Sequence, residues 1–248
     1  MVHWTGGYGA AFRHFTRFEF FLLPNRIHAR TSHHRKLLSN NSMIRMNISI
    51  GGIMNITTEI IRRVAYATGG AFILATILLA VFFAVDEPFG TLNDVFNGIS
   101  GILCGVLASM FYSQHHAKSP LTGQIALALA IIGAIVVTVG TILVVFKVTG
   151  WVLAGWYSTA GYALIGIWLV MFCYSMLNDT TLPYRLTMFG VIIGLVMAVG
   201  LIAVIGILNK VDTMDGLPVS LNISYFGYLG DLLFPFWSIW LARALVAK

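Results

Sequence analysis

Charged residues are scarce in this sequence. They make up 10% of the 248 residues, whereas hydrophobic residues make up 58%. A soluble domain carries about 25% charged residues, so this chain has too few polar side chains to cover a surface that faces water. Cysteine is equally rare. Both Cys104 and Cys173 lie in apolar segments, which argues against a disulfide framework and against a cysteine zinc site.

The sequence also lacks motifs that carry catalytic chemistry. It contains no phosphate-binding loop, no dinucleotide glycine fingerprint, no His-Glu-x-x-His and no Cys-x-x-Cys. It also contains no Gly-x-Ser-x-Gly elbow. Sequence reasoning therefore nominates no catalytic residue, no metal ligand and no cofactor, and it leans against an enzyme.

Long uncharged apolar stretches are present instead. Residues 123–146 read GQIALALAIIGAIVVTVGTILVVF, without a single charge. At about 1.5 Å per residue, such a helix crosses a hydrocarbon core of about 30 Å. Further apolar stretches, bounded by polar turns, predict an all-α polytopic membrane protein that is a bundle of six transmembrane helices. The expected spans are 64–85, 95–112, 123–146, 151–177, 186–208 and 225–246.

The first 53 residues differ from the rest. They hold seven of the fifteen lysines and arginines, and Glu19 is their only acid. Because Gly51 and Gly52 closely precede Met54, and two glycine codons can form a ribosome-binding site, we favour Met54 as the true start. A transit peptide and a genuine basic tail are the alternatives. Residues 1–53 are thus expected to be a leader that is disordered or not translated, and 54–248 a single six-helix domain. Without the leader the chain is nearly neutral, so no nucleic-acid partner is inferred.

The basic residues of the remaining chain predict its orientation. If the first loop lies outside, two lysines lie at outside ends, Lys147 and Lys210. Six basic residues then lie at inside ends, namely Arg62, Arg63, Lys118, Arg185, Arg243 and Lys248. This excess satisfies the positive-inside rule with both termini inside. The layout of short-looped spans, ending in a tryptophan-containing helix and a basic tail, resembles that of small bacterial membrane proteins. It implies a bacterial cytoplasmic membrane and no particular activity.

Small residues recur at helical spacing in two of the expected spans. Gly101 and Gly105 lie four residues apart in the second span, and Gly190 and Gly194 do so in the fifth. Small residues let helices approach closely in lipid. We interpret both ridges as helix-packing faces within the chain. Contacts in a homo-oligomer, or chance in glycine-rich spans, are the alternatives.

One acidic residue, Asp231, falls within an expected span, where a carboxylate is expensive and defaults to a functional hypothesis. In the predicted orientation several polar residues share its depth in the outer half of the bundle. We expect a ligand pocket that opens outward and is formed by Asp231, Tyr228, Asn97, Ser100, Tyr162 and Ser158, with Thr138 and Thr141 nearby. The alternatives are a hydrated Asp231 at the membrane interface, and hydroxyls bonded to their own helices.

Three functions follow as hypotheses. The first is a non-enzymatic integral membrane protein that handles or senses a small solute through this pocket. The second is an accessory subunit that packs against a larger membrane complex through its glycine ridges. The third is a membrane enzyme acting on lipid. The sequence gives it poor support, because histidines and acidic residues are not clustered. The lipid bilayer is the expected partner, and the sequence does not identify the solute.

Overall fold

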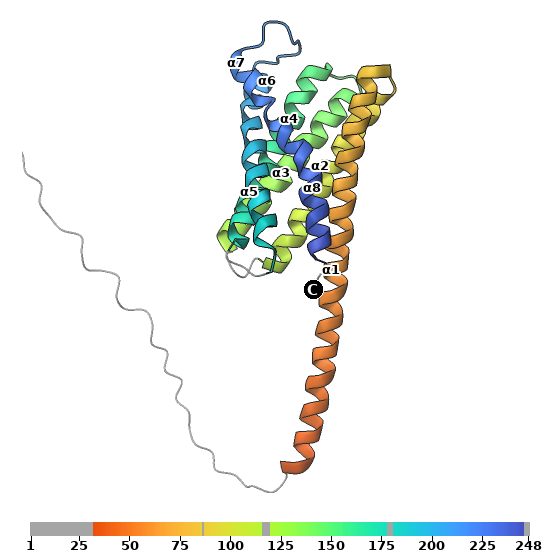
Figure 1. Cartoon of the computed structure of the whole chain (residues 1–248), viewed down its shortest axis with the longest axis vertical. Coiled ribbons are helices and arrows are strands. Elements are labelled where there is room, and N and C mark those ends of the chain that lie inside the picture. The colour runs from red at the N-terminus through yellow and green to blue at the C-terminus, as the bar shows by residue number, and fades with distance from the viewer. Residues whose placement is uncertain (1–31, 86, 116–119, 178–180, 246–248) are drawn as a thin grey trace, which may run out of the picture. The chain divides into compact units, whose positions relative to one another are not determined.

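A computed structural model describes residues 32–85, 87–115, 120–177 and 181–245, and side chains from Thr58 onward. The chain divides into two compact units, Met1–Ser49 and Ile50–Lys248. The second unit contains the helical bundle (Figure 1). Within the described ranges the structure is helical and has no strand, which confirms the all-α fold class. The division at residue 53 between leader and domain stays a prediction.

The helices follow one another with short connections, as long helices joined by short loops do in antiparallel bundles. In chain order they are α1 (Ser32–Val85), α2 (Phe89–His115), α3 (Pro120–Val145), α4 (Trp151–Met176), α5 (Tyr184–Ala198), the 3₁₀ turn η1 (Val199–Ile202), α6 (Ala203–Leu208), α7 (Val219–Ser224) and α8 (Gly227–Ala244).

Five helical segments of the described chain are long and apolar enough to cross a membrane. They are Thr58–Val85, Phe89–Gln114, Leu121–Val145, Trp151–Met176 and Tyr184–Leu208. The last of these runs through α5, η1 and α6. The chain is therefore a multi-pass membrane protein. The sixth expected span corresponds to α8, which has 18 residues and contains Pro235. It is not among the five, so the count of six stays a prediction.

The second span is longer than expected. We predicted residues 95–112 as the shortest span, yet α2 begins at Phe89 and has 27 residues. The error arose because the polar residues before position 95 resemble a loop. Glu87 holds the start of this helix, since its Oε2 accepts hydrogen bonds from Thr91 N (3.4 Å) and Thr91 Oγ1 (3.1 Å).

Two lysines end the helices that precede the α4 and α7 segments. Lys147 and Lys210 adopt positive φ angles of 55° and 51° after α3 and α6. In both places the next residue donates its N–H five residues back, from Val148 to Leu143 O (2.8 Å) and from Val211 to Gly206 O (2.9 Å). This is the hydrogen bond of a Schellman cap, a motif in which glycine usually holds the position of the two lysines.

Glycines bring helix backbones together around α4. A methyl group at Gly133 of α3 would lie 2.6 Å from the carbonyl oxygen of Gly161, and one at Gly194 of α5 would lie 2.5 Å from that of Gly166. No Cβ fits at these distances, so α3 and α5 approach α4 as closely as they do because glycine is present. This makes α4 the central helix, packed against α3 and α5 on two sides.

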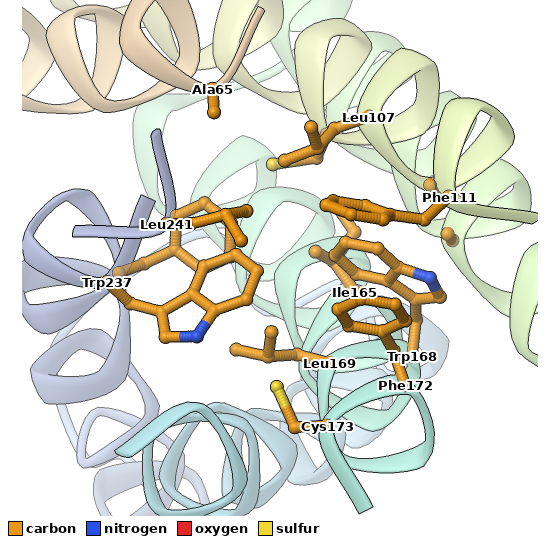
Figure 2. Close-up of a cluster of buried hydrophobic side chains, with 14 of the residues drawn as sticks. Ala65, Leu107, Phe111, Ile165, Trp168, Leu169, Phe172, Cys173, Trp237 and Leu241 are labelled. Carbon is orange, nitrogen blue, oxygen red and sulfur yellow. The ribbon is translucent and has the colours of Figure 1, made fainter. Parts of the chain in front are cut away.

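One half of the bundle has an aromatic core. Figure 2 shows Trp168, Phe172 and Phe111 together, with Trp237 facing them across Leu169. The rings of Trp168 and Phe172 stack at 5.9 Å, and those of Phe111 and Phe172 lie 4.5 Å apart. Burying such large rings stabilises the bundle through close contact, because lipid tails are themselves apolar and give little hydrophobic driving force.

Candidate functional site

A cavity of about 260 Å³ lies in the bundle at the end where α1 leads into α2 and α3 leads into α4. Its walls come from the last turns of α1 and α3 and from the first turns of α2, α4 and α8, and α5 contributes none of the described lining residues. The residues that line it are Phe72, Ala75, Thr76, Leu79, Phe83, Asn93, Asp94, Asn97, Val144, Trp151, Ala154, Gly155, Ser158, Tyr162, Tyr225, Tyr228, Asp231 and Leu232.

Tyr162 connects α4 to α2 at the inner end of this cavity. Its hydroxyl donates to the carbonyl oxygen of Asn97 (2.8 Å) and lies 2.6 Å from Ser100 Oγ. Its ring packs against Phe72 of α1, with centroids 5.2 Å apart. Tyr162 is buried, so its hydroxyl needs these partners, and the contacts fix where the ring stands. The result is a rigid floor between the cavity and the aromatic core.

A row of amides and a carboxylate forms the α2 wall. Asn97 Nδ2 donates to Asn93 Oδ1 (3.3 Å), and Asn93 Nδ2 donates to Asp94 Oδ1 (3.4 Å). Asn93 is buried, with 4% of its surface exposed. Since Asn93 and Asn97 are four residues apart on a helix, they lie on one face, and that face lines the cavity.

Asp231 lies on the α8 wall, one turn after the start of the helix. Its Oδ1 atom is buried and has no hydrogen-bond partner among the described residues. Pro235, four residues later, has no N–H to bond the carbonyl oxygen of Asp231. An unpaired carboxylate oxygen in an apolar bundle is costly, so this is the least satisfied polar group of the cavity wall.

Asp212 fixes the start of α4 beside the cavity, from the connection between α6 and α7. Its Oδ2 accepts the N–H of Gly150 (2.9 Å) and its Oδ1 accepts that of Leu153 (3.1 Å). Trp156 Nε1 donates to the carbonyl oxygen of Val211 (3.0 Å). Helix N-termini leave such N–H groups without partners in their own helix. Here a distant loop supplies the acceptors, so the position of α4 depends on Asp212.

The structure brings most of the pocket residues predicted from sequence to this one cavity. Asp231, Tyr228, Asn97, Tyr162 and Ser158 all line it. Ser100 lies behind Tyr162 and reaches the site only through their hydrogen bond. Whether these residues bind a ligand stays a prediction.

The two threonines of α3 do not join them. Thr141 donates to the carbonyl oxygen of Asp94 (3.1 Å) and so ties α3 to α2. Thr138 donates to Ala134 of its own helix (2.8 Å) and lines a groove between α2 and α3 on the outer surface. The expectation that Thr138 belongs to the pocket is wrong, because shared depth in the membrane does not fix the face of a helix.

The predicted packing glycines contact other helices of the same chain. Methyl groups at Gly101 and Gly105 of α2 would lie 2.9 Å from Val137 and 3.2 Å from Ala134 of α3. At Gly190, a methyl group would lie 2.6 Å from the indole nitrogen of Trp237. Together with the contact between Gly194 and Gly166, these positions place both ridges inside the bundle.

Sequence reasoning missed several residues of the site. Asn93 and Asp94 were assigned to a loop, and the aromatic residues Phe72, Trp151 and Tyr225 were not considered. The four-residue spacing of Asn93 and Asn97 was a usable signal once the helix is extended back to Pro88. No comparable signal in the sequence indicates that Asp212 reaches the start of α4, since Asp212 lies 62 positions after Gly150.

Comparison with known proteins gives no relative. No protein-family model matches the chain, and no match was found among curated proteins or among solved structures.

Proposed function

We propose that the chain is a non-enzymatic integral membrane protein that binds a small solute in the cavity between α1, α2, α4 and α8. The observation that carries this proposal is the buried, unpaired Oδ1 of Asp231 on the cavity wall. Buried polar groups in native proteins have partners, and one that lacks a partner within the chain calls for one from outside. A cavity of 260 Å³ is slightly smaller than the usual ligand pocket of about 300 Å³ or more, which suits a small solute.

Binding is favoured over catalysis by the residues of the wall. No histidine, cysteine or lysine occurs among the described lining residues, so a nucleophile activated by a neighbouring base is not formed there. The aromatic core fills the other half of the bundle, and Tyr162 belongs to the same cluster of buried residues. The solute therefore enters and leaves at one end of the bundle.

We place that end outside the cell. With both termini inside, the connections of α1 to α2 and of α3 to α4 face outward, and the basic residues support this orientation. The resemblance in layout noted above supports a bacterial cytoplasmic membrane, and the lipid bilayer is the partner that surrounds the helices.

Cysteine accessibility tests the proposal. In a chain with Cys104→Ala and Cys173→Ala, a cysteine replacing Ser158 should react with a membrane-impermeant thiol reagent added outside. Ser158 lines the cavity. A cysteine replacing Ile132, which is 50% exposed on the surface of α3, faces lipid and should stay unlabelled. Equal, slow labelling of both would show that water and solutes do not reach the cavity.

Filling the cavity gives a second test. Gly155 lines the cavity, and a methyl group there would have only the Tyr228 hydroxyl nearby, at 3.8 Å. Gly155→Leu should therefore fold, block the cavity and slow the labelling at Ser158 at least tenfold. Gly70→Leu is the matched control, because a methyl group at Gly70 meets no atom within 4 Å. Unchanged labelling in Gly155→Leu would contradict the proposal.

An accessory subunit of a larger membrane complex is the second candidate function. It is favoured by the groove of about 590 Å³ between α2 and α3, which is lined mainly by apolar residues such as Ile102, Val106 and Ile135. The glycine ridges themselves no longer support it, because they pack inside the bundle. Co-purification of a partner that is lost in Val106→Trp would favour this function over solute binding.

A further inference from the structure

Several hydrogen-bond donors of the cavity wall already have acceptors within the protein. Five of its donor side chains already donate to atoms of the protein. Thr76 donates to Phe72 O, Asn97 to Asn93, Asn93 to Asp94, Tyr162 to Asn97 O and Tyr225 to Met214 Sδ. The carboxylate of Asp231, by contrast, keeps a buried oxygen without a partner. A solute that bonds this oxygen must bring a donor or a positive charge.

Charge in the cavity has one sign. Asp94 and Asp231 line it, and no arginine, lysine or histidine is among the described lining residues. In the described part of the chain, the ion pairs join Glu59 to Arg62 and Arg63, far along α1 from the cavity. Tyr228 lines the same cavity as Asp94 and Asp231. Two carboxyl groups that face one space of low polarity favour a cation, whose charge stabilises their ionised form.

Helix N-termini do not reverse this preference. Backbone N–H groups at the starts of helices can bind anions. At the start of α4, however, Asp212 takes the N–H groups of Gly150 and Leu153. At the start of α8, the N–H groups of Tyr228 and Leu229 donate to Tyr225 O and Phe226 O. An anion in the cavity would find these donors occupied.

Aromatic rings complete the wall and distinguish between kinds of cation. Phe72, Phe83, Trp151, Tyr225 and Tyr228 line the cavity, and the rings of Tyr225 and Tyr228 stack at 5.9 Å. Aromatic faces attract organic ammonium groups and also pack against their carbon atoms. A metal ion needs several oxygen or nitrogen ligands close together. The described residues contain no group of three His, Cys, Asp or Glu side chains that could hold one.

We propose that the solute is a small organic ammonium ion, with its charge paired to Asp231 and its carbon atoms against the rings of Tyr228, Tyr225 and Trp151. This proposal rests on the proposed function, because it names the chemical class of the solute that the same cavity binds. Asp94, held by Asn93, contributes a second negative charge at the α2 wall.

Choline and its uncharged analogue 3,3-dimethylbutan-1-ol test this directly, because they have nearly the same shape and differ in charge. Binding to the purified full-length protein in detergent is measured by isothermal titration calorimetry and by the rise in thermal unfolding temperature on adding ligand. Choline should bind at least tenfold more tightly than the alcohol. Sodium chloride at the same concentration serves as the inorganic control and should not compete with choline.

The variants Asp231→Asn and Asp94→Asn remove charge without changing shape. Asp231→Asn should weaken choline binding at least tenfold and leave binding of the alcohol within twofold, and Asp94→Asn should have a smaller effect of the same kind. Asp215→Asn is the matched control, because Asp215 is exposed in the connection after α6 and lies outside the cavity. If Asp231→Asn does not fold, Asp94→Asn still separates charge from shape.

The outcomes separate the two proposals. If the alcohol binds as tightly as choline in the wild type and in Asp231→Asn, and Gly155→Leu abolishes both, the cavity binds solutes and the preference for cations is wrong. If competition by sodium removes choline binding, the site holds an inorganic cation and the proposal is also overturned. If neither compound binds and Ser158 is also inaccessible to reagent, the proposed function itself fails.

Discussion

Replacing Asp212 should loosen the end of the bundle that contains the cavity, by an amount that the structure allows us to estimate. Its carboxylate is the only acceptor shown for the N–H groups of both Gly150 and Leu153 among the described contacts. Asp212→Ala removes both hydrogen bonds and a negative charge at the positive end of the α4 dipole. Asp212→Asn keeps one carbonyl oxygen and removes the charge alone.

Each loss has a known size. Removing a side-chain acceptor at a helix N-terminus costs about 0.5–2 kcal/mol, and removing a carboxylate at that end costs about 0.3–1 kcal/mol when it is exposed. Asp212 is exposed, so water partly replaces the lost acceptor. We therefore expect Asp212→Ala to lower the free energy of unfolding by about 1–2 kcal/mol, and Asp212→Asn by about half as much.

A substitution at Gly150 tests the contact between Asp212 and the start of α4 independently. Its φ of −71° is open to any residue, so backbone strain does not require glycine there. A methyl group at this position would instead lie 2.6 Å from Oδ2 of Asp212 and would push the carboxylate away. Gly150→Ala should thus cost nearly as much as Asp212→Ala, and the double variant should cost little more than either single one.

Unfolding by sodium dodecyl sulfate in mixed micelles, followed by tryptophan fluorescence, measures these differences. The exposed Asp215→Ala is the control and should leave the free energy of unfolding unchanged within about 0.5 kcal/mol. In 1 M salt, where the screening length falls to about 3 Å, the effect of charge in Asp212→Asn should shrink. Additive costs in the double variant, or an Asp212→Ala cost equal to that of Asp215→Ala, would refute the reasoning.

Four further predictions concern other parts of the chain. Lys147→Gly should raise the free energy of unfolding by about 0.5–1 kcal/mol, because the φ of 55° is strained for lysine and unstrained for glycine; a loss of stability would contradict this. Ser238→Ala should lower it by about 0.6 kcal/mol, because the buried hydroxyl of α8 donates to Ala65 O of α1 at 2.7 Å; no change in the same assay would show that the bond contributes nothing. A chain that starts at Met54 should reach the membrane at the same level as the full chain in fractionated cells, and loss of insertion would show that the leader is needed. A cysteine replacing Asp215 should react with impermeant reagent from outside, and reaction from the cytoplasmic side alone would invert the topology.

The helical fold could be predicted from sequence because lipid imposes a strong rule on the backbone. Every N–H and C=O in the hydrocarbon must be bonded within the chain, so a long uncharged stretch such as 123–146 has to be helical. The rule does not determine where a helix begins within a polar stretch of sequence. The first two turns of α2 contain Asn93 and Asp94, and only the surrounding helices show that these two residues face a cavity and not the aqueous surface.

The sequence predicted the level of the site along the bundle, but not which face of each helix lines it. Asp231 could be identified because a carboxylate in an apolar span is costly. The predicted orientation of the spans put Tyr228, Asn97 and Tyr162 at the same level, and these residues line the cavity. The rotation of each helix was not available from sequence, which is why Thr138 was assigned wrongly. Contacts between distant loops and helices, such as that of Asp212 with Gly150, depend on the tertiary fold and have no local pattern.

The glycine contacts also determine where the cavity can change shape. Backbone meets backbone between α3 and α4 at Gly133, between α4 and α5 at Gly194, and between α1 and α8 at Gly69, where a methyl group would lie 3.2 Å from Pro235 O. Such contacts cannot shift without separating the helices. Gly101 of α2 differs, because the atoms nearest to a methyl group there belong to the side chain of Val137, which can change rotamer. A solute that needs more room than 260 Å³ should therefore displace α2 more readily than α1 or α8.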